Sequence, residues 1–362
     1  MFAWRSPALF LLASLAPSLR CQDSALAASQ AEHPLLRNDP VPATSRASAD
    51  RGLQFVLAAQ NRDGSWGDEP GMAGDVGNTA FAALALLATN NTPTRGEHAF
   101  ALRRAVDWLM LKTRGFDSSP PSFRMGTLLQ RKLGENADLY LVCVCYSQLV
   151  GMNVDGTDDT RMRAELSGMC RSIAALQKPN GVWETSYEPM LTTVLAWLSL
   201  QQSAAVGVAI ESASPQKALE YLRRDCLEHA TGVFREAHWG NNERFVTQAG
   251  GLRVFYGMGI DNTDDAQRAT QVVLRMRFDQ DVGGAQGGEE FLGALFATQA
   301  LFLQHRGPWE QWQPKIARAL LACQNADGSW NGHHCITGRV FCTSASVMTL
   351  LMPDRLLPMG ER

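Results

Sequence analysis

Four residues near the end of the chain are of the types that bind zinc or carry a reactive thiol. They are His333, His334, Cys335 and Cys342. Two histidines and two cysteines can complete a tetrahedral zinc site, and a thiol at a helix start has a lowered pKa. The same cysteines can instead form a Cys335–Cys342 disulfide, with the histidines solvated. The spacing matches no standard zinc module, so zinc, a disulfide and free thiols all stay open.

Other polar residues lie where a turn leads into an apolar stretch. These candidate ligand residues are Asn78, Glu184, Glu188, His238, Arg244, Glu289, Glu290 and Arg339. If each turn belongs to a helical hairpin, the hairpins gather these residues at one rim, where a binding site would form. Arg339 could hold an anionic group there. Scattered acids on a rim are more often only solvated, and paired carboxylates would also suit glycan hydrolysis.

A repeated phrase shows which elements must position these residues. Three copies follow an apolar stretch and precede another: residues Gln60 to Trp66, Gln177 to Trp183 and Gln324 to Trp330. Weaker glycine-containing copies fall between them. The markers 66, 116, 183, 234, 284 and 330 are 46 to 67 residues apart, which indicates six repeat units.

Each unit has the pattern of a helical hairpin. Arg51 to Gln60 and Thr79 to Leu87 both show a 3.6-residue apolar period. The second helix of a pair is apolar on nearly all sides, as in residues 80–87, so it must be buried. We therefore expect an all-α chain with an inner layer of second helices and an outer layer of first helices, closed into a ring.

The repeat phrase resembles the prenyltransferase and squalene-oxidase repeat of squalene-hopene cyclases and protein prenyltransferase β subunits. The resemblance covers about residues 49 to 352. It implies an α/α toroid of six inner and six outer helices around an apolar cavity. It also implies that the glutamine and tryptophan of each phrase are structural clasps between helices, here Gln60, Trp66, Gln177, Trp183, Gln324 and Trp330.

The sequence does not contain the continuous catalytic motifs of this superfamily. The cyclase motif Asp-x-Asp-Asp, whose central acid protonates an alkene or epoxide, is absent, and the nearest strings, residues 156–159 and 262–265, are interpreted as helix caps. Of the prenyltransferase zinc ligands, the Asp and Cys have no counterpart, and Cys342 stands where the family has its His. The thioester string Gly-Cys-Gly-Glu-Gln of complement-like toroids is absent too.

The remaining segments suggest export. Residues 1–27 have the pattern of a signal peptide, 28–48 of a linker, and 353–362 of a C-terminal tail after a toroid spanning 49–352. The apolar run of the first segment is too short to span a membrane, so no transmembrane segment is expected in the mature chain. A net charge of −3 without a basic patch argues against nucleic acid. Most of the cysteines are expected to be small core residues.

The sequence thus favours an exported toroid, secreted or periplasmic, with a non-catalytic binding or scaffold role. An isoprenoid or another apolar molecule is the expected ligand of its cavity. The alternative is a divergent terpenoid- or prenyl-processing enzyme that uses the zinc or thiol residues from His333 to Cys342. Zinc is the one cofactor considered, and the sequence identifies no protein partner.

Overall fold

Two concentric layers of helices form the fold, and their order alternates along the chain. The computed structural model describes residues 40–115, 123, 126–152, 156–183, 188–210, 213–236, 243–278, 289–304, 306–332, 338–354 and 356–357. All of them belong to the unit Asn38–Arg362. None of the described helices is long and apolar enough to cross a membrane.

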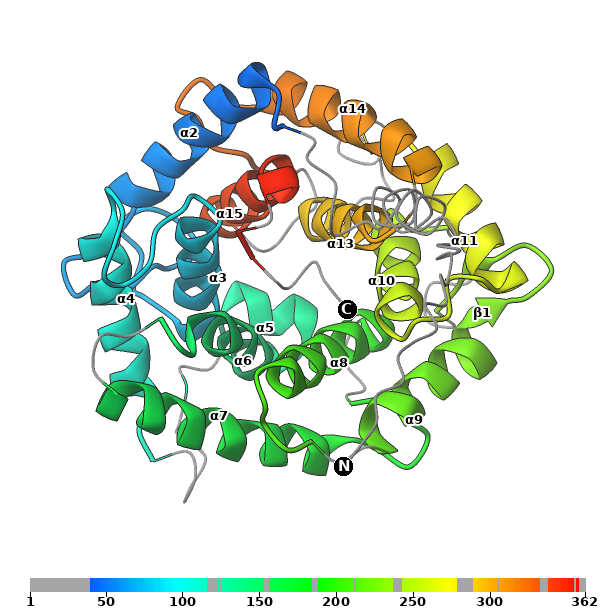
Figure 1. The fold of residues 1–362 in the computed structure, drawn as a ribbon, viewed down its shortest axis with the longest axis horizontal. Helices are drawn as coiled ribbons and strands as arrows, with labels where there is room; N and C mark the ends of the chain where they lie inside the picture. Colours follow the sequence, from blue (N-terminus) through cyan, green and yellow to red (C-terminus); the bar gives the residue numbers. More distant parts are fainter. Residues whose placement is uncertain are drawn as a thin grey trace, which may run out of the picture. The chain divides into compact units, whose positions relative to one another are not determined.

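The inner helices are hydrophobic on all sides and buried along their length. They are α3 (Val76–Leu87), α6 (Ala137–Leu149), α8 (Pro189–Ala205), α10 (Phe245–Gly257), α13 (Glu290–Phe302) and α15 (Gly338–Leu350). Each contacts the next in this order, and α15 returns to α3, so the layer is a closed ring (Figure 1). This confirms the predicted α/α toroid.

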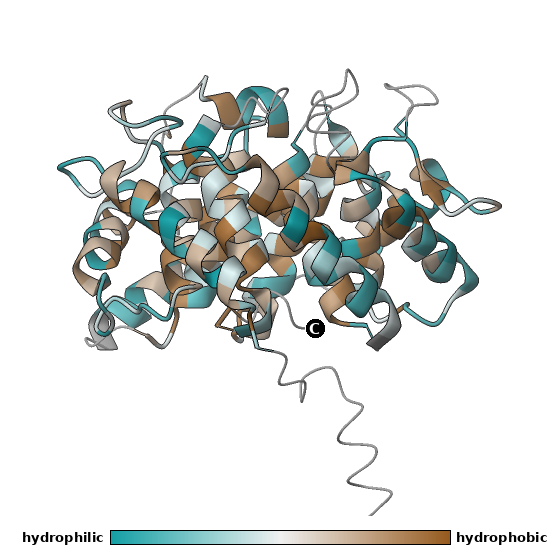
Figure 2. Ribbon diagram, turned by 90° about the horizontal axis from the view of Figure 1, so that it is seen from above, coloured by the Kyte–Doolittle hydropathy of each residue, from teal (hydrophilic) through white to brown (hydrophobic). Residues whose placement is uncertain are grey.

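The outer helices are amphipathic and pack on the inner ring. They are α2 (Ala43–Ala58), α4 (Ala99–Lys112), α7 (Gly156–Leu176), α9 (Ala213–Tyr221) with the π-helical turn η2 (Leu222–Cys226), α11 (Asp264–Arg275) and α14 (Arg306–Cys323). Short elements complete the described fold: α5 (Leu128–Leu133), the hairpin β1 (Leu227–Glu228) and β2 (Val233–Phe234), and the 3-10 turn η4 (Met352–Asp354). In side view the loops are largely hydrophilic (Figure 2).

The three repeat phrases make the same contacts in each copy. The side-chain amides of Gln60, Gln177 and Gln324 each donate to a carbonyl of their own turn and to one of a neighbouring outer helix, at 2.9 to 3.0 Å. The last of these outer-helix acceptors is Ser48 of α2, so Gln324 closes the outer ring. The glutamines therefore tie one outer helix to the next.

The tryptophans of the phrases fasten each turn to the preceding outer helix. The indole Nε1 atoms of Trp66, Trp183 and Trp330 donate to Val56, Ile173 and Leu320, ten residues earlier, at 2.6 to 2.8 Å. All three rings are fully or almost fully buried. A buried donor that also fills a large apolar volume is what a structural clasp needs.

Helix α2 begins before the predicted boundary. It starts at Ala43, so the last residues of the expected linker 28–48 belong to a helix instead. The first outer helix therefore begins eight residues before the predicted Arg51. Ser45, Ser48 and Ala49 are buried in it. Their small side chains have the composition of a linker, but they also allow α2 to pack closely on α15.

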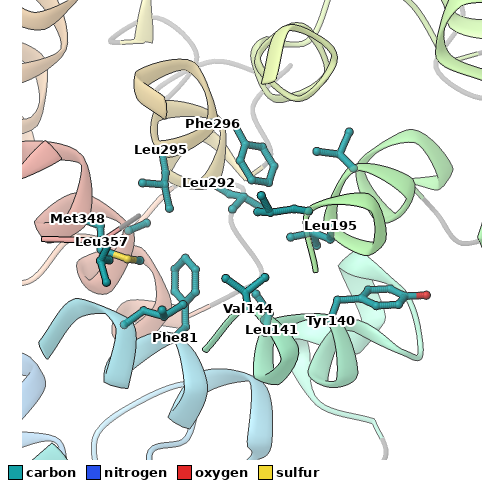
Figure 3. Close-up of a cluster of buried hydrophobic side chains, with 14 of the residues drawn as sticks. Phe81, Tyr140, Leu141, Val144, Leu195, Leu292, Leu295, Phe296, Met348 and Leu357 are labelled. Atoms are coloured by element: carbon teal, nitrogen blue, oxygen red, sulfur yellow. The ribbon is translucent and has the colours of Figure 1, made fainter. Parts of the chain in front are cut away.

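The centre of the ring, here called the lumen, is apolar and filled. Phe81, Leu141, Leu292, Phe296 and Met348 point into it from the inner helices and are only 1% to 2% exposed (Figure 3). Side chains that lined an open cavity would keep more accessible surface. The predicted apolar character of the centre is therefore present, and the described side chains that point into it are buried.

The predicted C-terminal tail contributes to this filling. Leu357, which follows α15 and η4 in the chain, belongs to the same buried cluster as Met348, and both are drawn in the close-up of the lumen (Figure 3). Asp354, the last residue of η4, forms an ion pair with Arg46 of α2, whose Nη2 donates to both carboxylate oxygens at 2.7 and 2.8 Å. Leu357 is 8% exposed, so it is part of the core.

Candidate functional site

A cluster of buried carboxyl groups lies at the start of α3. Asp75 caps this helix, with Oδ1 accepting from the backbone amide of Asn78 at 2.8 Å. The side-chain amide of Asn78 donates to Asp75 Oδ2 and to Asp68 Oδ1, both at 3.0 Å. Asn78 thus bridges two acids at a helix N-terminus, where negative charge is favoured.

The neighbouring helix α6 adds a third acid, Asp138. Its Oδ1 accepts from the backbone amide of Gly77 at 2.6 Å, and its Oδ2 accepts from the side-chain amide of Gln130. A Cβ atom on Gly77 would lie 2.4 Å from Asp138 Oδ1. Glycine at position 77 is therefore what allows the carboxyl group of Asp138 to reach the start of α3.

The cluster adjoins the polar end of the lumen. Gly77 precedes Phe81 by four residues on α3, and Asp138 precedes Leu141 by three on α6, so each pair shares a helix face. Phe81 and Leu141 both point into the lumen (Figure 3). Asp138 and the backbone of Gly77 thus lie about one helical turn from these apolar side chains, toward the N-terminal ends of α6 and α3.

Burial makes these acids hard to ionise. It raises the pKa of Asp75 to about 7, with a smaller contribution from the negative charge of Asp138. Burial also raises the pKa of Asp138 to about 6, against the lowering effect of the bonds from Gly77 and Gln130. Near neutral pH the pair can therefore hold and release protons.

A second charged cluster surrounds Glu188 at the start of α8. Its carboxylate is bound by Lys132 of α5, at 3.0 Å from Nζ to Oε1, and by Arg244 at the start of α10. Glu236 lies nearby and accepts from the backbone amide of Met190. Burial, and next the charge of Glu188, raises the pKa of Glu236 to about 7. Two of the predicted rim residues, Glu188 and Arg244, are thus brought together as a buried ion pair.

The other predicted rim residues have different surroundings. Glu289 and Glu290 are buried at the start of α13, and Glu289 has a left-handed backbone with φ 54°. Arg339 pairs with Glu69 at 2.6 Å and with Asp327 at 2.9 Å. Its charge is already matched by two carboxylates, so the expected role of holding an anionic ligand is not supported.

Several predicted residues lie outside the described part of the chain. They are Glu184, His238, His333, His334 and Cys335. Cys342 is buried on α15. Within the described ranges there is no group of three or more His, Cys, Asp or Glu residues suited to a metal. Cys143, Cys145, Cys170 and Cys226 are buried, in agreement with the expected core role.

The two acidic strings interpreted as caps are at helix starts. Thr263 caps α11 by accepting from the amide of Ala266 at 3.2 Å, and Asp264 and Asp265 occupy the first turn. Asp158 and Asp159 are in the first turn of α7. Both strings lie in the outer layer, away from the inner-helix starts that carry the buried acids.

Sequence reasoning missed Asp68, Asp138, Lys132 and Glu236. Asp138 is the one charge at the start of an otherwise apolar inner helix, which was a usable signal. A second signal was the string from Asp75 to Asn78, Asp-Val-Gly-Asn, which keeps the first acid of Asp-x-Asp-Asp at an inner-helix start. Lys132 and Glu236 carry no such sequence signal.

Known proteins share the repeat and the fold. Residues 35–118 and 291–359 match the family described as prenyltransferase alpha-alpha toroid domain. Drimenyl diphosphate synthase of Streptantibioticus cattleyicolor is 36% identical over 85 residues, which cover 22% of this chain and 15% of the synthase. The match therefore spans only a small part of that enzyme.

Two solved structures share the architecture at low sequence identity. An α-1,6-mannanase of Salegentibacter sp. HEL1_6, in complex with α-1,6-mannotriose, has a TM-score of 0.59 at 7% identity, covering 86% of this chain and 99% of the mannanase. A type II terpene cyclase from Scytonema, in complex with geranylgeranyl dihydroxybenzoate, has a TM-score of 0.52 at 16% identity, covering 87% and 98%. These likenesses establish the fold. The chain is thus an α/α toroid, and its residues 35–118 and 291–359 match the prenyltransferase alpha-alpha toroid domain, in agreement with the resemblance read from the repeat.

Proposed function

We propose that the lumen binds an isoprenoid or a similar apolar chain, and that this binding, without chemistry, is the role of the protein. The observation that carries the proposal is the lumen itself, which large apolar side chains of the inner helices line (Figure 3). A terpene cyclase with the same fold binds a geranylgeranyl compound. Burial of an apolar chain there would be favourable in proportion to its area.

An apolar ligand can enter the lumen only by displacing side chains that are already buried there. Leu357 is the labelled lumen residue that comes from the chain after α15 rather than from an inner helix (Figure 3). Moving it requires no change in the closed ring of inner helices. Displacement of Leu357 is therefore the change by which we expect the lumen to admit an apolar ligand.

Equilibrium binding of farnesol tests this proposal. The Leu357→Ala variant should bind farnesol more tightly than the wild type, because less of the chain competes for the lumen. Leu292→Trp should bind it more weakly, because the larger ring narrows the same space. Leu111→Ala is a matched control on the outer face of α4, where Leu111 is 64% exposed, and it should bind as the wild type does. Equal affinity of all four proteins would refute a lumen site.

An enzymatic role is the second candidate, and one observation favours it. Asp138 places a carboxyl group against Gly77, at the position that the central acid occupies in an Asp-x-Asp-Asp string beginning at Asp75. Burial raises the pKa of Asp138 to about 6, so a protonated fraction remains near neutral pH that can serve as the proton donor. The acid absent from the continuous motif would then come from the neighbouring inner helix.

Product analysis separates the two roles. The protein would be incubated with linear isoprenoid alcohols and diphosphates, and the extracts searched for cyclic isomers by gas chromatography and mass spectrometry. The enzymatic role predicts a cyclic product that Asp138→Asn abolishes while farnesol still binds. Binding without any product from these substrates supports the non-catalytic role.

A further inference from the structure

In the described part of the chain, the hydrogen-bond donors to the carboxyl groups at the polar end of the lumen are neutral. Asp75 accepts from the backbone and side chain of Asn78, and Asp138 accepts from Gly77 and Gln130. The charges that act on Asp75 are those of Asp138 and Asp68, and both are negative. No cation of the described chain therefore compensates this pair.

The cations of neighbouring elements form ion pairs with other carboxylates. Lys132 of α5 binds Glu188, and Arg339 of α15 binds Glu69 and Asp327. Neither is among the described charges that act on Asp75 or Asp138. The end of the lumen formed by α3 and α6 therefore differs from the Glu188 cluster, where two cations already neutralise a carboxylate.

A fully buried acceptor atom lies within this acid pair. Asn78 is 0% exposed, and its Oδ1 has no hydrogen-bond partner in the described part of the chain. Its Nδ2 is already used on Asp68 and Asp75. A buried acceptor without a donor is costly, and its neighbours here are themselves acceptors. The missing partner must be a donor.

We propose that this end of the lumen recognises a positively charged head group, such as a protonated amine, at the end of an apolar chain. The inference rests on the proposed binding of an apolar chain in the lumen. An ammonium group offers three donors and a charge, and Asn78 Oδ1, Asp75 and Asp138 offer acceptors and the opposite charge. A diphosphate head would meet the same carboxylates and be repelled.

Binding of the cation should release protons. In the free protein burial favours the protonated form of Asp75 and Asp138. A bound ammonium group favours the ionised form, so it takes the place of the proton. Affinity for an amine should therefore rise with pH over the range in which the two acids titrate, with Asp68 of the preceding turn adding to the negative field.

Isothermal titration of three matched probes tests the inference: farnesylamine, farnesol and farnesyl diphosphate. At pH 8 farnesylamine should bind about tenfold more tightly than farnesol, and the diphosphate should bind most weakly. At pH 6, titration in buffers of different ionisation enthalpy should show proton release for the amine and none for farnesol. If the alcohol binds and the amine binds no better, the inference is overturned while the lumen site stands. If no probe binds, both are overturned.

Variants locate the recognition site. Asp138→Asn and Asp75→Asn should each remove the preference for the amine over farnesol. Asp107→Asn changes an acid to an amide on the exposed face of α4, where the carboxylate is 62% exposed, and should keep the preference. Circular dichroism would verify that each variant is folded. An amine preference that survives both lumen-end variants would overturn the assignment.

Discussion

Replacing Asp75 by asparagine should change how stability depends on pH. Asp75 is 2% exposed, and burial, with the charge of Asp138, raises its pKa from 3.8 to about 7. In the unfolded chain the group ionises near its ordinary pKa, so between these two values the unfolded state loses the proton first. The stabilising contribution of the protonated group is therefore complete below pH 3.8 and is lost as the pH rises through 7.

The size of this effect follows from the shift. About three pKa units at 1.36 kcal/mol each correspond to at most about 4 kcal/mol, shared in part with Asp138 because the two acids interact. Asparagine keeps an oxygen for the helix cap but cannot ionise. The free energy of unfolding of Asp75→Asn should thus fall less between pH 4 and pH 8 than that of the wild type.

Urea unfolding at several pH values measures the difference directly. Asp107→Asn removes an exposed acid and should follow the wild-type curve. The reasoning would be refuted if Asp75→Asn and the wild type lost the same free energy of unfolding over this range, or if the variant lost more. Asp75 would then be ionised in the folded protein without cost.

Three further substitutions test the packing. Gln324→Ala removes the bond to Ser48 that closes the outer ring and the bond to Gly328 within the turn, and should cost about 1 to 3 kcal/mol in urea unfolding. An unchanged free energy of unfolding would show that the clasp is dispensable. Trp183→Phe keeps an aromatic ring but loses the 2.6 Å hydrogen bond to Ile173, so a similar loss in the free energy of unfolding is expected. A thermal midpoint equal to that of the wild type would contradict this expectation. Gly77→Ala puts a methyl group against Asp138 and should cost about 1 to 3 kcal/mol in the same unfolding assay; a neutral result would mean that Asp138 lies elsewhere.

The sequence predicted the architecture because the repeat phrase is local. Gln60 and Trp66 make their bonds to the same turn, to the helix just before it and to the next outer helix, so their spacing carries the structural information. The apolar inner helices were equally readable. The start of α2 was misplaced because small residues such as Ser45 and Ser48 are typical of linkers, although they also permit close helix packing.

The candidate site was less predictable, because its partners are distant in sequence. Asp138 meets Gly77 from 61 residues away, and Arg244 meets Glu188 from 56. No local pattern specifies such pairs; they follow from the order of the inner helices around the ring. Glu188 and Arg244 could be named as rim residues from their positions, but not as an ion pair.

A crystal structure of the protein with farnesol is the most direct test of the central claim, that the lumen is a binding site. The account predicts density for the ligand among Phe81, Leu292 and Phe296, with Leu357 displaced from its place in the buried cluster. Farnesol bound only between outer helices, with Leu357 still in the lumen, would contradict it.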